Sequence, residues 1–255
     1  MISRDRPSPR HVLLWVLLSA LFATYYILHS RVGSDSSIER HAELLIDPPF
    51  VFRVMIPWVL SKLLPMSWLD MTLTRTVIAA AFSLSSILLM PAFMARVLGR
   101  DLSAIERTRA CRAIFIVLIA HYLLPRNLKF YYVYDLPAIT FYEVCFLALT
   151  DRRNWVRWVG VATSTLFAFN RETIGIAVVH AAGWHIAQLW PRERRSPNST
   201  AGVFLPLLIS CVGILFVRTW LAQQLNHSVQ QSFSWMEGDQ LRLVANLIRM
   251  GTKFH

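Results

Sequence analysis

The segment LTRTVIAAAFSLSSILLMPAFMARV, residues 73–97, decides the fold class. It is almost entirely apolar and is longer than the roughly 20 residues that cross a bilayer as a helix. Pro91 within it predicts a kink. The whole chain of 255 residues is 55% hydrophobic, and only 16% of its residues are charged, against about 25% in soluble domains. We therefore predict an all-α polytopic membrane protein, with residues 1–255 forming a single transmembrane domain.

Further apolar runs lie on both sides of this segment, and the polar stretches between them are short. We predict about seven transmembrane helices, at 12–29, 73–97, 113–124, 136–149, 158–169, 174–190 and 203–221. The shortest of these runs cannot cross a bilayer straight. They are expected to extend into flanking polar residues or to line a water-filled cavity.

The basic residues that give the net charge of +11 are spread over the loops between apolar runs and are not gathered on a single basic face. Arg4, Arg6 and Arg10 precede the first apolar run, and cytoplasmic loops carry an excess of Lys and Arg. This predicts a cytoplasmic N-terminus, an external loop at 31–70 and an external polar tail at 223–255. The positive-inside effect explains the basic residues, so we expect a lipid bilayer and no nucleic acid as a partner.

The predicted external loop contains DSSIERHAELLIDPPFVFRVMIPW, residues 35–58. Asp35, Glu39 and Glu43 recur every four residues, so an amphipathic helix would place the three carboxylates along one side. The sequence DPP stops that helix. The apolar segment that follows contains one cation, Arg53.

Two more polar clusters are predicted on the same external side. The first lies in PRNLKFYYVYD, residues 125–135, and contributes Arg126, Lys129, Tyr134 and Asp135. The second lies in NRET and contributes Asn170, Arg171 and Glu172. Ionisable groups at membrane depth are costly and mark functional cavities. We therefore expect an external cavity whose carboxylates act as a general base and whose cations hold a phosphate.

Structural roles for the same residues remain open at this point. Glu39 and Glu43 also fit the wet face of a helix lying on the membrane, and Arg53 fits an interfacial anchor. Asp135 is a natural N-cap for the helix that follows it. Tyr134 also fits the aromatic belt at the membrane surface.

The order of the motifs DPPFVFRVMIP, YVYDLPAITFYE and FNRETIGI resembles that of small bacterial members of the GT-C superfamily of integral-membrane glycosyltransferases. The resemblance extends over about residues 35–176. It implies a GT-C-like fold, in which a first span and an external loop with amphipathic helices belong to a module of seven transmembrane helices. The paired acidic residues of several such families are missing, because the acids of this chain are spaced four apart.

The resemblance implies an enzyme of the bacterial inner membrane. It would transfer a sugar from a polyprenyl-phosphate donor to an envelope glycan or lipid acceptor on the external face, with inversion. Asp35 is the expected catalytic base, with Glu39 and Glu43 as substitutes. The expected substrate-binding residues are Arg53, Arg126, Lys129, Tyr134, Asp135, Asn170, Arg171 and Glu172. No cofactor is implied with certainty, and a divalent metal stays open.

Two other classes of function remain alongside the enzyme. The first is a transporter or flippase of polysaccharide or lipid-linked sugar, in which Glu143 and His121 within apolar runs would couple transport to ion movement. The second is a non-catalytic membrane subunit of an envelope glycan pathway. In that case the three polar clusters need not converge.

Overall fold

The computed structural model describes residues 9–30, 37–43, 55–122, 135–171, 173–189 and 197–224. Of these described residues 88% are helical, and none lies in a strand. In chain order the helices are α1 (Pro9–His29), α2 (Ile38–Ala42), α3 (Met55–Leu63), α4 (Met66–Leu69), α5 (Thr72–Leu98), α6 (Ala104–Tyr122), α7 (Asp135–Leu149), α8 (Asn154–Phe167), α9 (Ile174–Leu189) and α10 (Pro197–Gln224). The all-α fold predicted from the sequence is confirmed.

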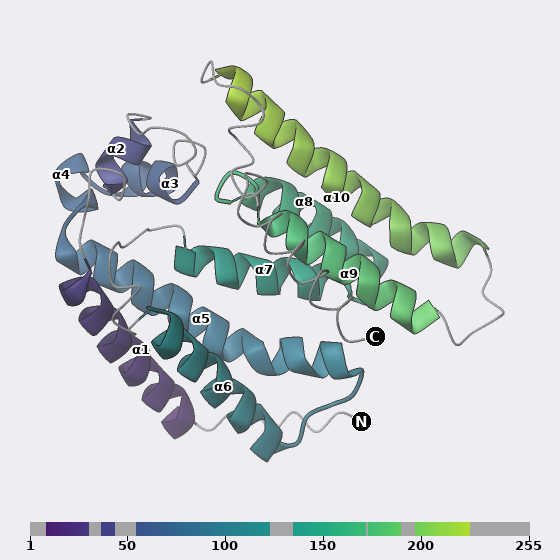
Figure 1. Cartoon of the computed structure of the whole chain (residues 1–255), viewed down its shortest axis with the longest axis horizontal. Coiled ribbons are helices and arrows are strands. Elements are labelled where there is room, and N and C mark those ends of the chain that lie inside the picture. The colour runs from purple at the N-terminus through teal and green to yellow at the C-terminus, as the bar shows by residue number, and fades with distance from the viewer. Residues whose placement is uncertain are drawn as a thin grey trace, which may run out of the picture.

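Helices α5 and α7 occupy the middle of the bundle (Figure 1). On one side α5 packs against α1 and α6, and on the other α7 packs against α8 and α9. Helix α10 lies over α8 and α9. Helices α7 and α8 approach closely at Gly160, because a Cβ added there would lie 3.0 Å from side-chain and backbone atoms of Leu149.

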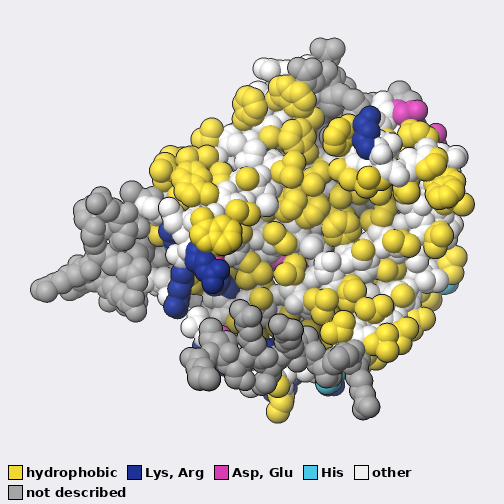
Figure 2. All heavy atoms as spheres, turned by 180° about the vertical axis from the view of Figure 1, so that it is seen from behind, with side chains coloured by type: hydrophobic (Ala, Val, Ile, Leu, Met, Phe, Trp, Pro, Cys, Tyr) yellow, Lys and Arg dark blue, Asp and Glu magenta, His cyan; other side chains and the backbone are white. Residues whose placement is uncertain are grey.

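Each of the seven predicted spans coincides with a helix, but the helices differ in their ability to cross a bilayer. Three are long and apolar enough to do so, at His11–His29, Thr72–Leu98 and Gly202–Gln223. Many of their outward side chains are apolar, as in the leucines of α1 that are more than half exposed: Leu13, Leu17, Leu21 and Leu28. Figure 2 shows hydrophobic side chains spread over much of the described part of one face of the molecule. Such a surface is suited to a lipid bilayer.

Helix α5 continues through Pro91 and ends at Leu98. Gly99 then adopts a left-handed conformation with φ of 66°, and its backbone N–H bonds to carbonyls of the last turn. Glycine reaches this conformation without steric cost. The C-terminus of α5 is therefore encoded locally.

Helix α6 begins earlier than the predicted span at 113–124. Ser103 and Glu106 form a capping box: the Ser103 N–H donates to Glu106 Oε2 at 2.8 Å, and the Glu106 N–H donates to Ser103 Oγ at 3.3 Å. This reciprocal bonding satisfies N–H groups at the start of a helix. The basic segment before residue 113 was expected to be a loop, and from Ala104 onward that expectation is wrong.

The amphipathic helix expected in the first external loop is short. Helix α2 covers only Ile38–Ala42, and Glu43 lies in the turn that follows. Asp35, the first carboxylate of the predicted stripe, lies outside the described residues. Of the expected row of acids, Glu39 alone is described within a helix.

Candidate functional site

One end of the bundle collects most of the described polar residues from the predicted clusters. Figure 1 shows α2, α3 and α4 gathered there, beside the end of α1 and the start of α5. The starts of α7 and α9 and the ends of α6, α8 and α10 point the same way. We call this end, which holds Asp70, Asp135 and Arg171, the Asp70 end.

Asp70 ties the short helix α2 to the long helix α5. Its carboxylate accepts hydrogen bonds from Ser37 Oγ at 2.5 Å and from the backbone N–H groups of Ile38 at 2.7 Å and Glu39 at 3.4 Å. The Arg75 guanidinium donates to the same carboxylate at 2.6 Å. One side chain thus caps the start of α2 and pairs with a cation one turn into α5.

The environment of Asp70 favours its charged form. Burial by itself raises the pKa of the carboxyl group, but the hydrogen bonds from Ser37, Ile38 and Arg75 outweigh it and hold the pKa below its ordinary value. The Arg75 side chain is 3% exposed. The removal of Asp70 would therefore take a counter-charge from a buried guanidinium.

A second ion pair joins two of the clusters predicted from the sequence. Arg171 Nη1 lies 2.5 Å from Asp135 Oδ1, and the two side chains are 30% and 20% exposed. Asp135 begins α7, whereas Arg171 lies in the turn between α8 and α9. The structure therefore brings together one residue from each of two predicted polar clusters.

Burial and backbone hydrogen bonds hold the turn that carries Arg171. Asn170 is fully buried, and its N–H donates to the Phe167 carbonyl at 2.9 Å. The Met55 N–H, at the start of α3, donates to the Phe169 carbonyl at 3.1 Å. Since α2 packs against α3, this bond connects the helix that carries Glu39 to the Asp135–Arg171 pair.

Four residues at this end are not among the predicted site residues: Asp70, Arg75, Tyr122 and Arg218. Arg218 is fully buried and donates to the Ala168 carbonyl at 3.3 Å. Tyr122 is buried against Tyr26 with ring centroids 5.2 Å apart, and it lies near enough to feel the charges of Asp135 and Arg171. Arg75 and Arg218 lie inside predicted spans, and that signal alone could have marked them.

The remaining predicted site residues divide into two groups. Glu39 is half-buried on α2 and Glu43 is exposed beside it, and within the described residues neither forms an ion pair. The others lie outside the described residues: Asp35, Arg53, Arg126, Lys129, Tyr134 and Glu172.

The arrangement supplies paired cations, carboxylates and a buried amide at one end of the bundle. Within the described residues, no group of three or more His, Cys, Asp or Glu side chains is placed to hold a metal. Guanidinium groups bind phosphate oxygens, and carboxylates such as Glu39 can accept a proton from a hydroxyl.

A separate polar seam lies inside the bundle between α5 and α7. Glu143 is 1% exposed in α7 and lies beside Ser86. The Ser86 hydroxyl is 2.9 Å from the Thr140 hydroxyl, which also bonds to the Phe82 carbonyl at 3.0 Å. A buried carboxylate within a helical membrane bundle is a functional candidate in its own right.

Comparisons of the chain with protein-family models, with curated proteins and with solved structures give no match.

Proposed function

We propose that this protein is a membrane glycosyltransferase that moves a sugar from a polyprenyl-phosphate donor to an envelope glycan or lipid acceptor. The observation that carries the proposal is the Asp135–Arg171 pair at 2.5 Å. It joins two polar clusters that are 36 residues apart, in a chain that is otherwise mostly apolar. Glu39 and Glu43 lie at the same end of the bundle (Figure 1) and supply candidate bases.

The proposed architecture is GT-C-like, with seven spans and the Asp70 end on the external face of a bacterial inner membrane. Seven helices at the predicted positions support this count. Three of them are short: α7 has 15 residues, α8 has 14 and α9 has 16. Short helices around a polar interior would let a lipid-linked donor enter sideways from the bilayer.

The proposed reaction is a single displacement at the anomeric carbon. The acceptor oxygen forms the new bond to that carbon as the bond from the carbon to the phosphate oxygen breaks. A carboxylate, with Asp35 as first choice and Glu39 or Glu43 as substitutes, takes the acceptor proton. Arg171, together with Arg53 and Arg126, stabilises the phosphate that leaves with its polyprenyl chain.

The experiment is glycan mass analysis of a deletion strain, complemented with wild-type and variant genes. We expect the deletion to remove one sugar from an envelope glycan or lipid. The triple variant Asp35→Asn, Glu39→Gln, Glu43→Gln should fail to restore that sugar, because no base remains in the loop. The matched control is Asp101→Asn, which neutralises an exposed carboxylate at the opposite end of the bundle. A triple variant that restores normal glycan would overturn the assigned base.

Glu143 favours a second candidate, a transporter or flippase of lipid-linked sugar. Its side chain is buried in the middle of α7, whereas His121, the other proposed coupler, is exposed on α6. For a transporter, Glu143→Gln should abolish ion-coupled movement of the lipid across vesicles. The glycosyltransferase should still transfer sugar with that substitution, so the two assays separate the candidates.

A further inference from the structure

The opposite end of the bundle, which holds Arg96, Arg100 and Asp151 and is called the Arg100 end, contains a groove between α1 and α6. The groove has a volume of about 290 Å³. A second hollow of about 390 Å³ shares Thr108 and Arg112 with it and continues toward the start of α6. The two hollows thus lie side by side along α6, at the end of the bundle opposite to the Asp70 end.

The groove lies where two parallel helices separate. Toward the Asp70 end, α1 and α6 are joined by aromatic contacts, with Phe22 and Tyr26 against Tyr122 at ring-centroid distances of 6.3 and 5.2 Å. Trp15 meets Phe115 edge-on at 5.9 Å, and both line the groove. This contact forms its inner wall.

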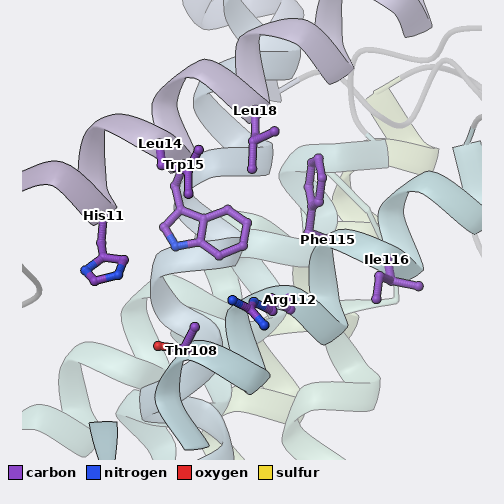
Figure 3. A pocket seen from close by; sticks show the side chains of 8 residues that line it. All are labelled: His11, Leu14, Trp15, Leu18, Thr108, Arg112, Phe115 and Ile116. Carbon is purple, nitrogen blue, oxygen red and sulfur yellow. The ribbon is translucent and has the colours of Figure 1, made fainter. Parts of the chain in front are cut away.

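The walls of the groove are apolar along the helices and basic at the mouth. Leu14 is 48% exposed and Ile116 is 63% exposed, and both line the hollow. Figure 3 shows Arg112 projecting from α6 toward Trp15 of α1. Arg109 lines the adjoining hollow. The rise of about 1.5 Å per helical residue places the apolar wall at Ile116 about 10 Å deeper than Arg109.

Within the described residues, the two arginines of the groove differ from nearby Arg100 in forming no ion pair. Glu106 is the only acidic residue of α6, and Arg100 engages both of its carboxylate oxygens, at 3.2 and 2.6 Å. Within the described residues, Arg109 and Arg112 form no ion pair, and both are exposed. They present two positive charges at the mouth of the apolar groove.

We propose that this groove binds an anionic phospholipid of the adjacent leaflet. Arg109 and Arg112 hold the phosphate, and an acyl chain lies against Leu14, Phe115 and Ile116. Basic pockets between membrane helices bind anionic headgroups in this manner, and guanidinium groups match phosphate oxygens. The site lies at the opposite end of the bundle from the proposed glycosyl-transfer site and does not depend on it.

The test is native mass spectrometry of protein released from nanodiscs that contain equal amounts of phosphatidylglycerol and phosphatidylcholine. Wild-type protein should retain phosphatidylglycerol preferentially. The double variant Arg109→Gln, Arg112→Gln should retain it about tenfold less. The matched control is Arg152→Gln, Arg153→Gln, which removes the same charge from two exposed arginines in the turn between α7 and α8 and should change retention less than about twofold.

A second variant distinguishes lipid binding in the groove from nonspecific attraction of lipid to surface charge. Thr108→Trp fills the groove and leaves every charge in place, and it should reduce retention of phosphatidylglycerol as the double variant does. The proposal is overturned by equal losses in the two arginine double variants, by retention unchanged in Thr108→Trp, or by equal retention of both lipids in wild type. Displacement of the lipid by glycerol phosphate alone would contradict the role of the acyl chain.

Discussion

The two ends of the bundle hold their charges differently. At the Asp70 end the charged side chains are largely withdrawn from solvent, with Arg75 at 3% exposure and Arg218 fully buried. At the Arg100 end, Arg100 is 56% exposed and Glu106 is 33% exposed. Exposed basic residues are expected at any cytoplasmic membrane surface. Buried charges are costly and need a compensating role, and this contrast directs attention to the Asp70 end.

Helix α7 offers a direct comparison of the two ends because it has an ion pair next to each of them. Asp135 at its start pairs with Arg171 at 2.5 Å. Asp151, just beyond its end, pairs with Arg96 at 3.2 Å. The chemical groups are the same, and the exposures are similar at 20% to 30%. The Asp151–Arg96 pair is therefore a natural control for the proposed function of the Asp135–Arg171 pair.

The largest expected effect is on sugar transfer by an Asp135→Asn variant. Loss of the carboxylate releases Arg171 from the position in which it would hold the donor phosphate, so we expect a fall of about 100-fold. Asp151→Asn should change transfer less than about threefold. The measurement is the fraction of modified glycan in the complemented deletion strain. Equal losses in both variants would mean that the pairs serve the fold alone and would remove the distinction between the ends.

A smaller effect, on stability, is expected for Asp70→Asn. The substitution keeps an acceptor for the N–H groups at the start of α2 but removes the carboxylate charge that pairs with buried Arg75. We expect the free energy of unfolding to fall by about 2 kcal/mol, less than the roughly 3–5 kcal/mol of a fully buried pair, because Asp70 is 30% exposed. Thermal unfolding in detergent measures this change. Glu106→Gln, which breaks an exposed pair at the Arg100 end, should leave the melting temperature nearly unchanged.

The pH dependence of the melting temperature shows whether Asp70 stabilises the fold through its charge. The pKa of Asp70 is lowered on folding, so its stabilisation is present above the unfolded value of 3.8 and disappears as the pH falls through the lower folded value. The difference in melting temperature between wild type and Asp70→Asn should therefore be full at pH 7 and narrow below about pH 4. A difference that stays constant over this range would show that Asp70 acts through shape and not through charge.

The sequence predicted the positions of the seven longer helices, because hydropathy averaged over long windows marks apolar runs and charged residues clearly separate one run from the next. The start of α6 was missed because the basic stretch was interpreted as a loop, although Ser103 and Glu106 have the spacing of a capping box in the sequence itself. The sequence also placed Asp135 and Arg171 on one side of the membrane without showing that they touch. That contact depends on how α7 packs against α8 and α9, which no local pattern encodes.

The links made by Asp70 were missed for a related reason. Its hydrogen-bond partners Ser37 and Ile38 lie more than 30 residues away in the sequence. No pattern close to Asp70 in the sequence therefore predicts these bonds. Arg75 and Arg218 did carry a local signal, as charges within apolar runs. Isolated charges inside predicted spans are therefore as good an indication of a candidate site as the acidic loop.

The most direct test of the central claim is sugar transfer by the purified protein, with a panel of synthetic polyprenyl-phosphate hexoses as donors. We expect wild-type protein and Arg96→Gln to consume one of these donors at similar rates. Arg171→Gln should be at least about 100-fold slower while it melts within a few degrees of wild type. Transfer by folded Arg171→Gln at the wild-type rate, or no consumption of any donor by wild type, would contradict the account.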